Sequence, residues 1–238
     1  MIRLFETVVK RRILAALDRP HDPFGLPLAL LAHLRDRKHI SLIDVGAHKG
    51  EFTRSIDQFC GVSKGLLIEP QPERAADLAL NYPPPRFTVL PIALSDRGGS
   101  TLLRINAFDP TTSLLPIKRD LPQLQGLDLS VQSTATCAVS TLDSVFCQWS
   151  SSDLTLLKLD VQGAENLVIA GGKTTLSKTE MVWAEVSFVA LYDGGCLFHE
   201  LHAQMYDEGF KLVELHSGFR SPCGELLQAD ALFLKSTT

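Results

Sequence analysis

A glycine-containing turn, Asp44-Val45-Gly46-Ala47-His48-Lys49-Gly50, directly follows an apolar segment and precedes a stretch typical of a helix. Glycines in such a turn let the backbone approach a ligand closely. The spacing differs from the G-x-G-x-x-G fingerprint of dinucleotide sites and from the phosphate-binding P-loop. Because the carboxylate of Asp44 would repel a pyrophosphate, the turn favours a cationic ligand.

Glu69 ends the next predicted strand, 23 residues beyond Gly46. Ligands of open α/β sheets bind beyond the carboxyl ends of the strands. A carboxylate there can accept hydrogen bonds from both hydroxyls of a ribose, each contributing roughly 1.5–3 kcal/mol. Taken singly, Asp44 has an alternative role as a helix cap and Glu69 as a surface acid. Together they favour a nucleoside-bearing cofactor, and the missing phosphate cradle favours S-adenosylmethionine over NAD or ATP.

Hydrophobic patterning predicts the elements that position these residues. Nearly all-apolar segments alternate with amphipathic ones from Ile40 onward, which indicates a parallel sheet covered by helices on both faces. The expected strands are 41–45, 65–68, 87–92, 154–159 and 181–186, and the expected helices are 50–59, 72–80, 142–147, 164–170 and 198–208. Two last strands, 210–215 and 231–234, fit an antiparallel pair at the sheet edge.

The stretch between two further predicted strands, 101–105 and 134–139, differs from the rest of the chain. It is rich in Pro, Ser, Thr, Asp and Leu and has no helical or strand periodicity. A loop of this length in a compact domain is usually functional or mobile. We therefore predict a lid or substrate loop over about 106–135, and a variable surface excursion is the alternative.

Residues 1–39 form a predicted N-terminal helical extension, separate from a main domain at 40–238. Helices are expected at 2–17 and at about 27–37, with Pro20 and Pro23 between them. The first forty residues carry eight Lys and Arg against four Asp and Glu. The first helix is therefore expected either to pack on the main domain or, through residues 1–20, to lie on a membrane surface or a partner.

Composition excludes several classes of protein. With 45% apolar and 21% charged residues the chain is an ordinary globular one, not disordered. The formal net charge of −4 argues against a general nucleic-acid binder. No secretory signal is visible, and the five cysteines include no C-x-x-C pair, so we expect a cytoplasmic protein with reduced thiols and commit to no metal site. The oligomeric state is left open.

Six motifs together resemble the FkbM family of S-adenosylmethionine-dependent methyltransferases. They follow the family's order over about residues 40–235: the turn 44–50, Ile68-Glu69-Pro70-Gln71-Pro72, 93–96, 140–144, 157–165 and 229–233. The resemblance implies a class I, Rossmann-like methyltransferase fold, with a seven-stranded, mostly parallel sheet whose last strand is reversed. It also implies methylation of a hydroxyl on a sugar, glycan or natural-product intermediate. His48 stands where the family often has Asn, and Gln162 where it often has Glu.

Position then assigns roles around the cofactor. Gly46 and Gly50, with Ala47 between them, should bring the backbone against the methionine part, and Asp44 should face its ammonium. Glu69, beside Pro70, should hold the ribose. Ala93 and Asp96 should flank the adenine, although Asp96 could instead be a turn residue.

The acceptor needs an oxygen aligned with the methyl group and a base for its proton. Asp160, at the end of the 154–159 strand, is the first candidate, with a helix cap as its alternative role. Lys158 is expected to pair with Asp160 or Glu185. An acid in an apolar strand is seldom there for packing, so Glu185 is a second candidate. His48 is a third candidate base, because the unperturbed pKa of a histidine is about 6.5. Its alternative role is only to place the backbone of the turn.

Two other functional classes compete with this enzyme. One is a non-catalytic module that keeps the fold and binds S-adenosylmethionine or a partner. The other is a nicotinamide-dependent oxidoreductase, against which the missing dinucleotide fingerprint argues. The acceptor itself, a small molecule or a glycan hydroxyl, cannot be identified from residues 106–135.

Overall fold

The computed structural model describes residues 26–107, 112–124, 128–149, 154–236. The predicted helix at 2–17 and its membrane contact through residues 1–20 lie outside these ranges. The second predicted helix is present as α2 (Leu28–Leu34) and begins directly after Pro27. Over the described ranges, no helix combines the length and the apolar character needed to cross a membrane.

Seven of the described strands form the main sheet, in the order β3-β2-β1-β7-β8-β10-β9. They are β1 (Ile40–Val45), β2 (Val62–Ile68), β3 (Phe87–Leu90), β7 (Leu154–Leu159), β8 (Thr179–Ser187), β9 (Phe210–Ser217) and β10 (Gln228–Lys235). All pairs are parallel except those of β10, which runs antiparallel to both β8 and β9. The predicted mostly parallel sheet with a reversed last strand is confirmed.

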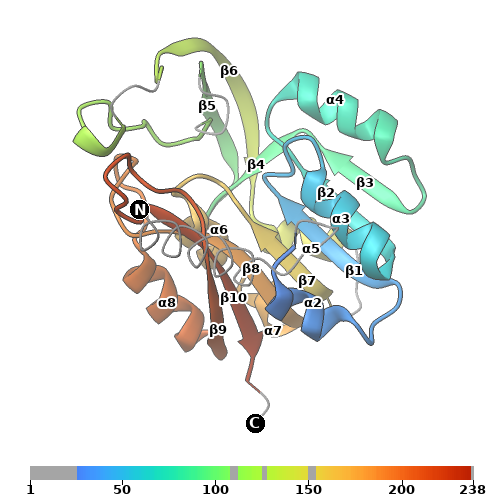
Figure 1. Cartoon of the computed structure of the whole chain (residues 1–238). Coiled ribbons are helices and arrows are strands. Elements are labelled where there is room, and N and C mark those ends of the chain that lie inside the picture. The colour runs from blue at the N-terminus through green and yellow to red at the C-terminus, as the bar shows by residue number, and fades with distance from the viewer. Residues whose placement is uncertain (1–25, 108–111, 125–127, 150–153, 237–238) are drawn as a thin grey trace, which may run out of the picture.

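Helices cover both faces of this sheet, as Figure 1 shows. On one face, α2, α3 (Glu51–Cys60) and α4 (Pro72–Asn81) pack onto Leu42, Leu67 and Leu156. The other face carries α5 (Leu142–Trp149), α6 (Glu165–Ala170), α7 (Lys173–Ser177) and α8 (Phe198–Asp207). Neighbouring residues such as Leu42 and Ile43 point to opposite faces and are both fully buried, which is why the strands are apolar throughout.

Two details differ from the sequence-based expectations. The predicted strand 87–92 is two strands, because the chain leaves the main sheet at Pro91 and β4 (Ile92–Leu94) joins a small sheet with β6 (Val131–Ser140) and β5 (Gly99–Asn106). Proline cannot donate a ladder hydrogen bond, which suits this break. Helix α7 was not expected at all. The predicted antiparallel pair at the sheet edge is confirmed, with β9 as the outer strand and the reversed β10 between β8 and β9.

The predicted lid is shorter than expected, because β5 extends to Asn106 and β6 begins at Val131. Within it, the described residues include a 3₁₀ turn (Pro122–Leu124) and a small cluster in which Ile117, Leu124 and Leu129 pack with Tyr192 and Leu227. The described part of this segment is therefore packed against the domain. Whether it moves stays a prediction.

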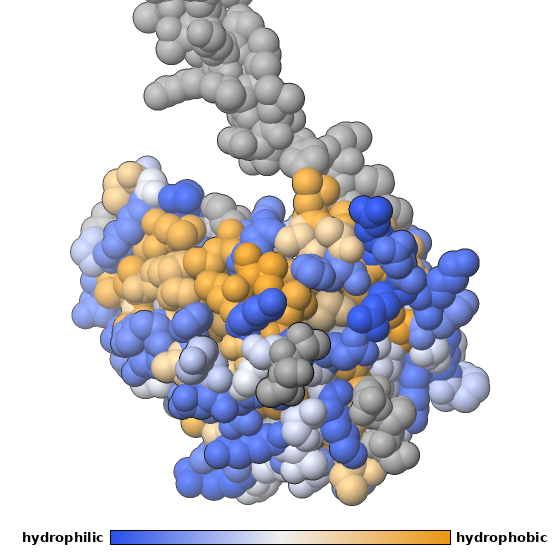
Figure 2. Space-filling view, turned by 90° about the horizontal axis from the view of Figure 1, so that it is seen from below, coloured by the Kyte–Doolittle hydropathy of each residue, from blue (hydrophilic) through white to orange (hydrophobic). Residues whose placement is uncertain are grey.

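The face seen from below shows how hydropathy is distributed on the surface. Apolar residues gather there in one broad area, and hydrophilic residues border it (Figure 2). The large apolar side chains that are exposed in the described chain include Leu80 on α4. Single exposed apolar side chains are common and need no partner to explain them.

Candidate functional site

A cavity of about 550 Å³ lies over the carboxyl ends of the parallel strands. Its wall draws on the ends of β1, β2, β7 and β8, on β4, and on β9 and β10. This is the edge at which open α/β sheets bind ligands, and the volume suits a cofactor together with part of a second ligand. The cavity lining includes the predicted residues Gly46, Ala47, His48, Glu69, Pro70, Ala93 and Asp160.

The turn after β1 is fastened to the end of β2 by Glu69. The backbone N–H of His48 donates to Oε2 of Glu69 at 2.9 Å, and the N–H of Gln71 donates to Oε1 at 2.9 Å. Gly46 N also donates to the carbonyl of Ile68 at 2.9 Å. Burial raises the pKa of Glu69 above its ordinary value, although the two N–H donors oppose that rise. Glu69 thus shapes the turn and still presents lone pairs to the cavity.

His48 is positioned through its backbone more than through its ring. Its φ is +53°, a left-handed conformation that Asn, Asp and His tolerate better than most residues. The imidazole Nδ1 lies 3.6 Å from Oε2 of Glu51, the first residue of α3. The ring borders the cavity, and the proposed role of His48 as a base stays a prediction.

Glycine is required at the two turn positions, Gly46 and Gly50, for contacts with different residues. A Cβ on Gly46 would stand 1.9 Å from the carbonyl oxygen of Asp160, so glycine here lets the turn after β1 touch the chain after β7. Gly50 precedes α3 at φ +76°, and a Cβ there would meet the ring of Tyr82, whose hydroxyl donates to the Gly50 carbonyl at 2.7 Å. Gly50 lies outside the cavity lining, contrary to the predicted contact with the cofactor.

Asp44 does not face the cavity, which corrects the expectation that it meets an ammonium there. It is fully buried, and Oδ2 accepts a hydrogen bond from Thr53 Oγ1 at 2.7 Å. Its Oδ1 lies 3.3 Å from Nζ of Lys158. The reason is register: Asp44 pairs with Lys158 across β1 and β7, so the two side chains share one face of the sheet.

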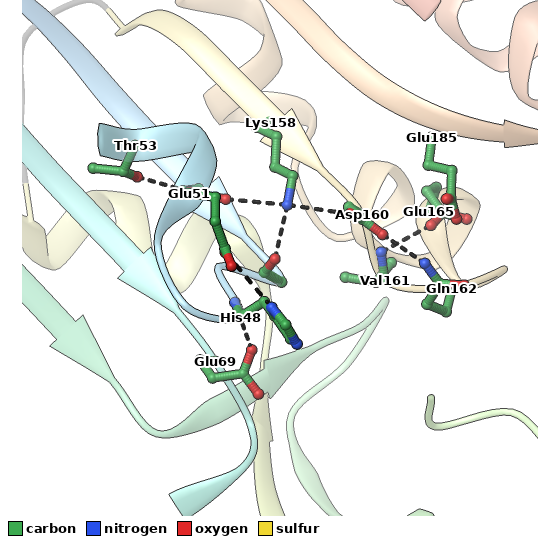
Figure 3. Close-up of polar contacts among 12 residues, drawn as sticks. His48, Glu51, Thr53, Glu69, Lys158, Asp160, Val161, Gln162, Glu165 and Glu185 are labelled. Carbon is green, nitrogen blue, oxygen red and sulfur yellow. Dashed lines mark hydrogen bonds and ion pairs between the residues drawn. The ribbon is translucent and has the colours of Figure 1, made fainter. Parts of the chain in front are cut away.

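Lys158 holds the junction of β1 and β7. Its Nζ donates to the Gly46 carbonyl at 2.7 Å and lies 3.3 Å from Oδ2 of Asp160. Burial opposes its charge, yet the carboxylates of Asp44 and Asp160 raise the pKa of Lys158 above its ordinary value. The predicted pairing with Asp160 is present, and Asp44 takes the place expected for Glu185 (Figure 3).

Asp160 is held on its other side by two residues whose part sequence reasoning missed. Gln162 Nε2 donates to Asp160 Oδ1 at 2.8 Å, and the hydroxyl of Tyr192 donates to Gln162 Oε1 at 2.7 Å. Tyr192 is only 2% exposed and does not line the cavity, so its hydroxyl acts on Gln162 rather than on a ligand. A neutral amide can donate to a carboxylate and accept from a phenol at once, which a glutamate could not do.

Behind Asp160 lie two more acids, Glu165, which is buried, and Glu185, which is half-buried. Glu165 accepts hydrogen bonds from the N–H groups of Val161 (2.9 Å) and Gly163 (3.0 Å), and burial raises its pKa to about 7. Gln228 Nε2 donates to Glu185 Oε2 at 2.7 Å, and burial beside Asp160 raises the pKa of Glu185 well above its ordinary value. Glu185 lies outside the cavity lining, which weighs against the predicted direct contact with an acceptor.

The structure places Asp230 at the cavity, and not Asp96. Asp96 is exposed beyond the end of β4, accepts a hydrogen bond from Ser95 Oγ at 3.1 Å, and stands outside the cavity lining, as its alternative role in a turn required. Asp230, on β10, lines the cavity. The signal for it was present: it is an acid inside an apolar strand, the argument applied to Glu185.

The strand order and this cavity define a class I methyltransferase fold. A methyltransferase FkbM from Methylobacillus flagellatus KT is similar in structure, with a TM-score of 0.57 and 16% identity over 91% of this chain, which spans about half (48%) of that one. The "putative S-adenosylmethionine dependent methyltransferase" from Listeria monocytogenes is also similar in structure, with a TM-score of 0.53 and 8% identity, over 88% of this chain and 97% of that one.

Sequence comparison gives the family. The model of the methyltransferase FkbM domain matches residues 44–212. The chain therefore belongs to the FkbM family of methyltransferases, and its cofactor is S-adenosylmethionine. A relative, "2-O-methyltransferase NoeI" of Sinorhizobium fredii (strain NBRC 101917 / NGR234), is 29% identical over 196 residues, which cover 78% of this chain and 72% of the relative.

Proposed function

We propose that the protein transfers a methyl group from S-adenosylmethionine to a hydroxyl oxygen, on a sugar or on a glycan or natural-product intermediate. The relative from Sinorhizobium fredii is named a 2-O-methyltransferase, which supports an oxygen acceptor. The proposal rests on the position and partners of Asp160. Its carboxylate lies at the cavity wall, where Lys158 holds one oxygen and Gln162 holds the other.

The residues of the cavity fit the cofactor. Glu69 has lone pairs for the ribose hydroxyls, and the backbone of Gly46 and Ala47 would lie against the methionine part. Ala93, which is 4% exposed between Ile92 and Leu94, offers an apolar surface for the adenine. When bound, the cofactor supplies an electrophilic methyl group on a sulfonium.

Asp160 then serves the acceptor. Its side chain is 36% exposed, so the carboxylate keeps lone pairs open toward the cavity. An acceptor hydroxyl that donates to Asp160 would be oriented for the transfer. The carboxylate would take the proton that this hydroxyl loses when the methyl group leaves the sulfonium for the oxygen. Orientation and a positioned base contribute on the order of 7–11 kcal/mol and 10²–10⁴-fold respectively.

Methyl transfer from labelled S-adenosylmethionine to a panel of sugars, measured with the wild type and with Asp160→Asn, tests the proposal. We expect transfer by the wild type, and a loss of 100-fold or more in kcat for the variant, because an amide accepts no proton there. Calorimetric titration should show that the variant still binds S-adenosylmethionine. Binding without transfer to any hydroxyl by the wild type would instead favour the non-catalytic module.

A further inference from the structure

Three polar residues form one row across the last strands of the sheet, at the edge that borders the cavity. Asp230 on β10 pairs with Glu185 of β8 on one side and with His216 of β9 on the other. Because β10 is reversed, its start lies at the carboxyl end of β8. Paired residues share a face of the sheet, and Trp183, two residues before Glu185, shares it too. Asp230, His216 and Trp183 all line the cavity.

Asp230 differs from the other acids of the site in its hydrogen bonding. Asp44, Glu69, Asp160, Glu165 and Glu185 each accept a hydrogen bond from the protein. The carboxylate of Asp230 makes no hydrogen bond or ion pair with any residue in the part of the chain that the structure describes. An ionised carboxylate is an acceptor only, so a ligand that satisfies Asp230 must bring donors.

The charges of the wall limit what that ligand can be. The described lining residues include four acids and one lysine or arginine, which is Lys158. The acids are Glu51, Glu69, Asp160 and Asp230. The ammonium of Lys158 is already matched by Asp44 and Asp160. Where Asp230 borders the cavity, a phosphate or carboxylate on the acceptor would face a carboxylate of the same sign, and like charges at close range are unfavourable.

We infer that Asp230, His216 and Trp183 form the acceptor end of the cavity, and that this end takes a neutral, hydroxyl-bearing ring in preference to an anionic one. A ring hydroxyl donates to Asp230, a second hydrogen bond reaches His216 at the exposed rim, and the apolar ring face lies on the indole. This inference rests on the proposed function and adds to it the charge class of the acceptor.

The test compares acceptors that differ only in charge, with the full-length chain and labelled S-adenosylmethionine. The probes are methyl glycosides of neutral hexoses, the 6-phosphates of the same hexoses and the corresponding uronic acids. The variant is Asp230→Asn, and the control is Asp207→Asn, which makes the same change of charge on the exposed surface of α8. Thermal unfolding of each variant checks that it is folded, and calorimetry measures its affinity for S-adenosylmethionine.

We expect the wild type to favour the neutral glycosides at least tenfold in kcat/KM. Asp230→Asn should raise KM for the neutral glycosides about tenfold and reduce the difference in kcat/KM between these glycosides and the phosphates. It should leave the affinity for S-adenosylmethionine within twofold, and the control variant should change none of these values. Better transfer to the phosphates, an unchanged KM, or a parallel loss of cofactor affinity would each overturn this inference and leave the proposed function standing. Failure of the wild type to methylate any sugar overturns both.

Discussion

At the scale of single residues, the site depends on which carboxylates are already engaged. Asp44 and Glu165 are committed to protein donors beneath the cavity, whereas Glu69 and Asp160 make such bonds and still border it. The sequence marks all four as acids near strand ends. Burial and partners then separate the acids that hold the turns in place from those that can meet a ligand.

Replacing Glu69 by alanine should lower affinity for S-adenosylmethionine by more than tenfold, about 1.4 kcal/mol. The variant would lose the proposed ribose contact and also the acceptor that holds the N–H groups of His48 and Gln71. Calorimetry of the folded variant measures the effect. Glu73→Ala, on the exposed surface of α4, is the matched control and should bind normally. A loss smaller than twofold at Glu69 would contradict its assignment to the ribose.

At the scale of elements, the site is assembled by contact between two turns. The turn after β1 and the chain after β7 touch at Gly46 and Asp160, and Lys158 bonds to both. Because β1 and β7 are neighbours in the sheet, their carboxyl ends arrive side by side. The proposed cofactor part and acceptor part of the cavity therefore share this junction.

Gly46→Ala should break the junction. The new Cβ would meet a backbone oxygen at 1.9 Å, and alanine is also disfavoured at φ +74°. We therefore expect the free energy of unfolding, measured in urea, to fall by at least about 3 kcal/mol, and we expect no cofactor binding. Gly194→Ala isolates the conformational cost, since φ is +73° there and no atom lies within 4 Å of the new Cβ. That control should lose about 1–2 kcal/mol. Equal losses would show that the contact with Asp160 is unimportant.

At the scale of the whole molecule, the sheet gathers buried and half-buried acids whose pKa values are raised: about 7 for Glu165 and about 6 for Asp230, with the pKa values of Glu185 and Glu69 also raised. Burial is the first cause in each. Such an acid binds its proton more tightly in the folded than in the unfolded protein, so its ionisation destabilises the fold. The raised pKa of Lys158 acts only above pH 10.5 and does not affect this range.

Stability should therefore fall as pH rises from about 4.5, the ordinary value of Glu165, through about 7. The contribution of Glu165 is on the order of 1–3 kcal/mol. Urea unfolding at intervals between pH 5 and pH 8 measures it. Glu165→Gln, which keeps an oxygen for the N–H groups of Val161 and Gly163, should flatten the dependence. Equal slopes for the two proteins would rule out Glu165 as the source.

Much of the fold could be predicted because its signals are local. An apolar strand buried on both faces and a helix with one buried face have different periods, so the alternation from Ile40 to Leu234 can be followed along the chain. The carboxyl ends of parallel strands meet at one edge, which is why Gly46, Glu69 and Asp160 could be placed together. The break at Pro91 could not be predicted in the same way. The sequence is apolar on both sides of it, and only the tertiary structure shows that β4 belongs to another sheet.

The sequence by itself determined the sheet, the edge that binds the cofactor and most of the side chains there. The tertiary structure decided which of those side chains face the cavity. Asp44 and Asp230 are both acids within apolar strands, yet Asp44 lies beneath the turn against Lys158, whereas Asp230 borders the cavity. That difference depends on strand order and on the insertion of β10 between β8 and β9, and contacts between segments so distant in the chain leave no periodicity in the sequence.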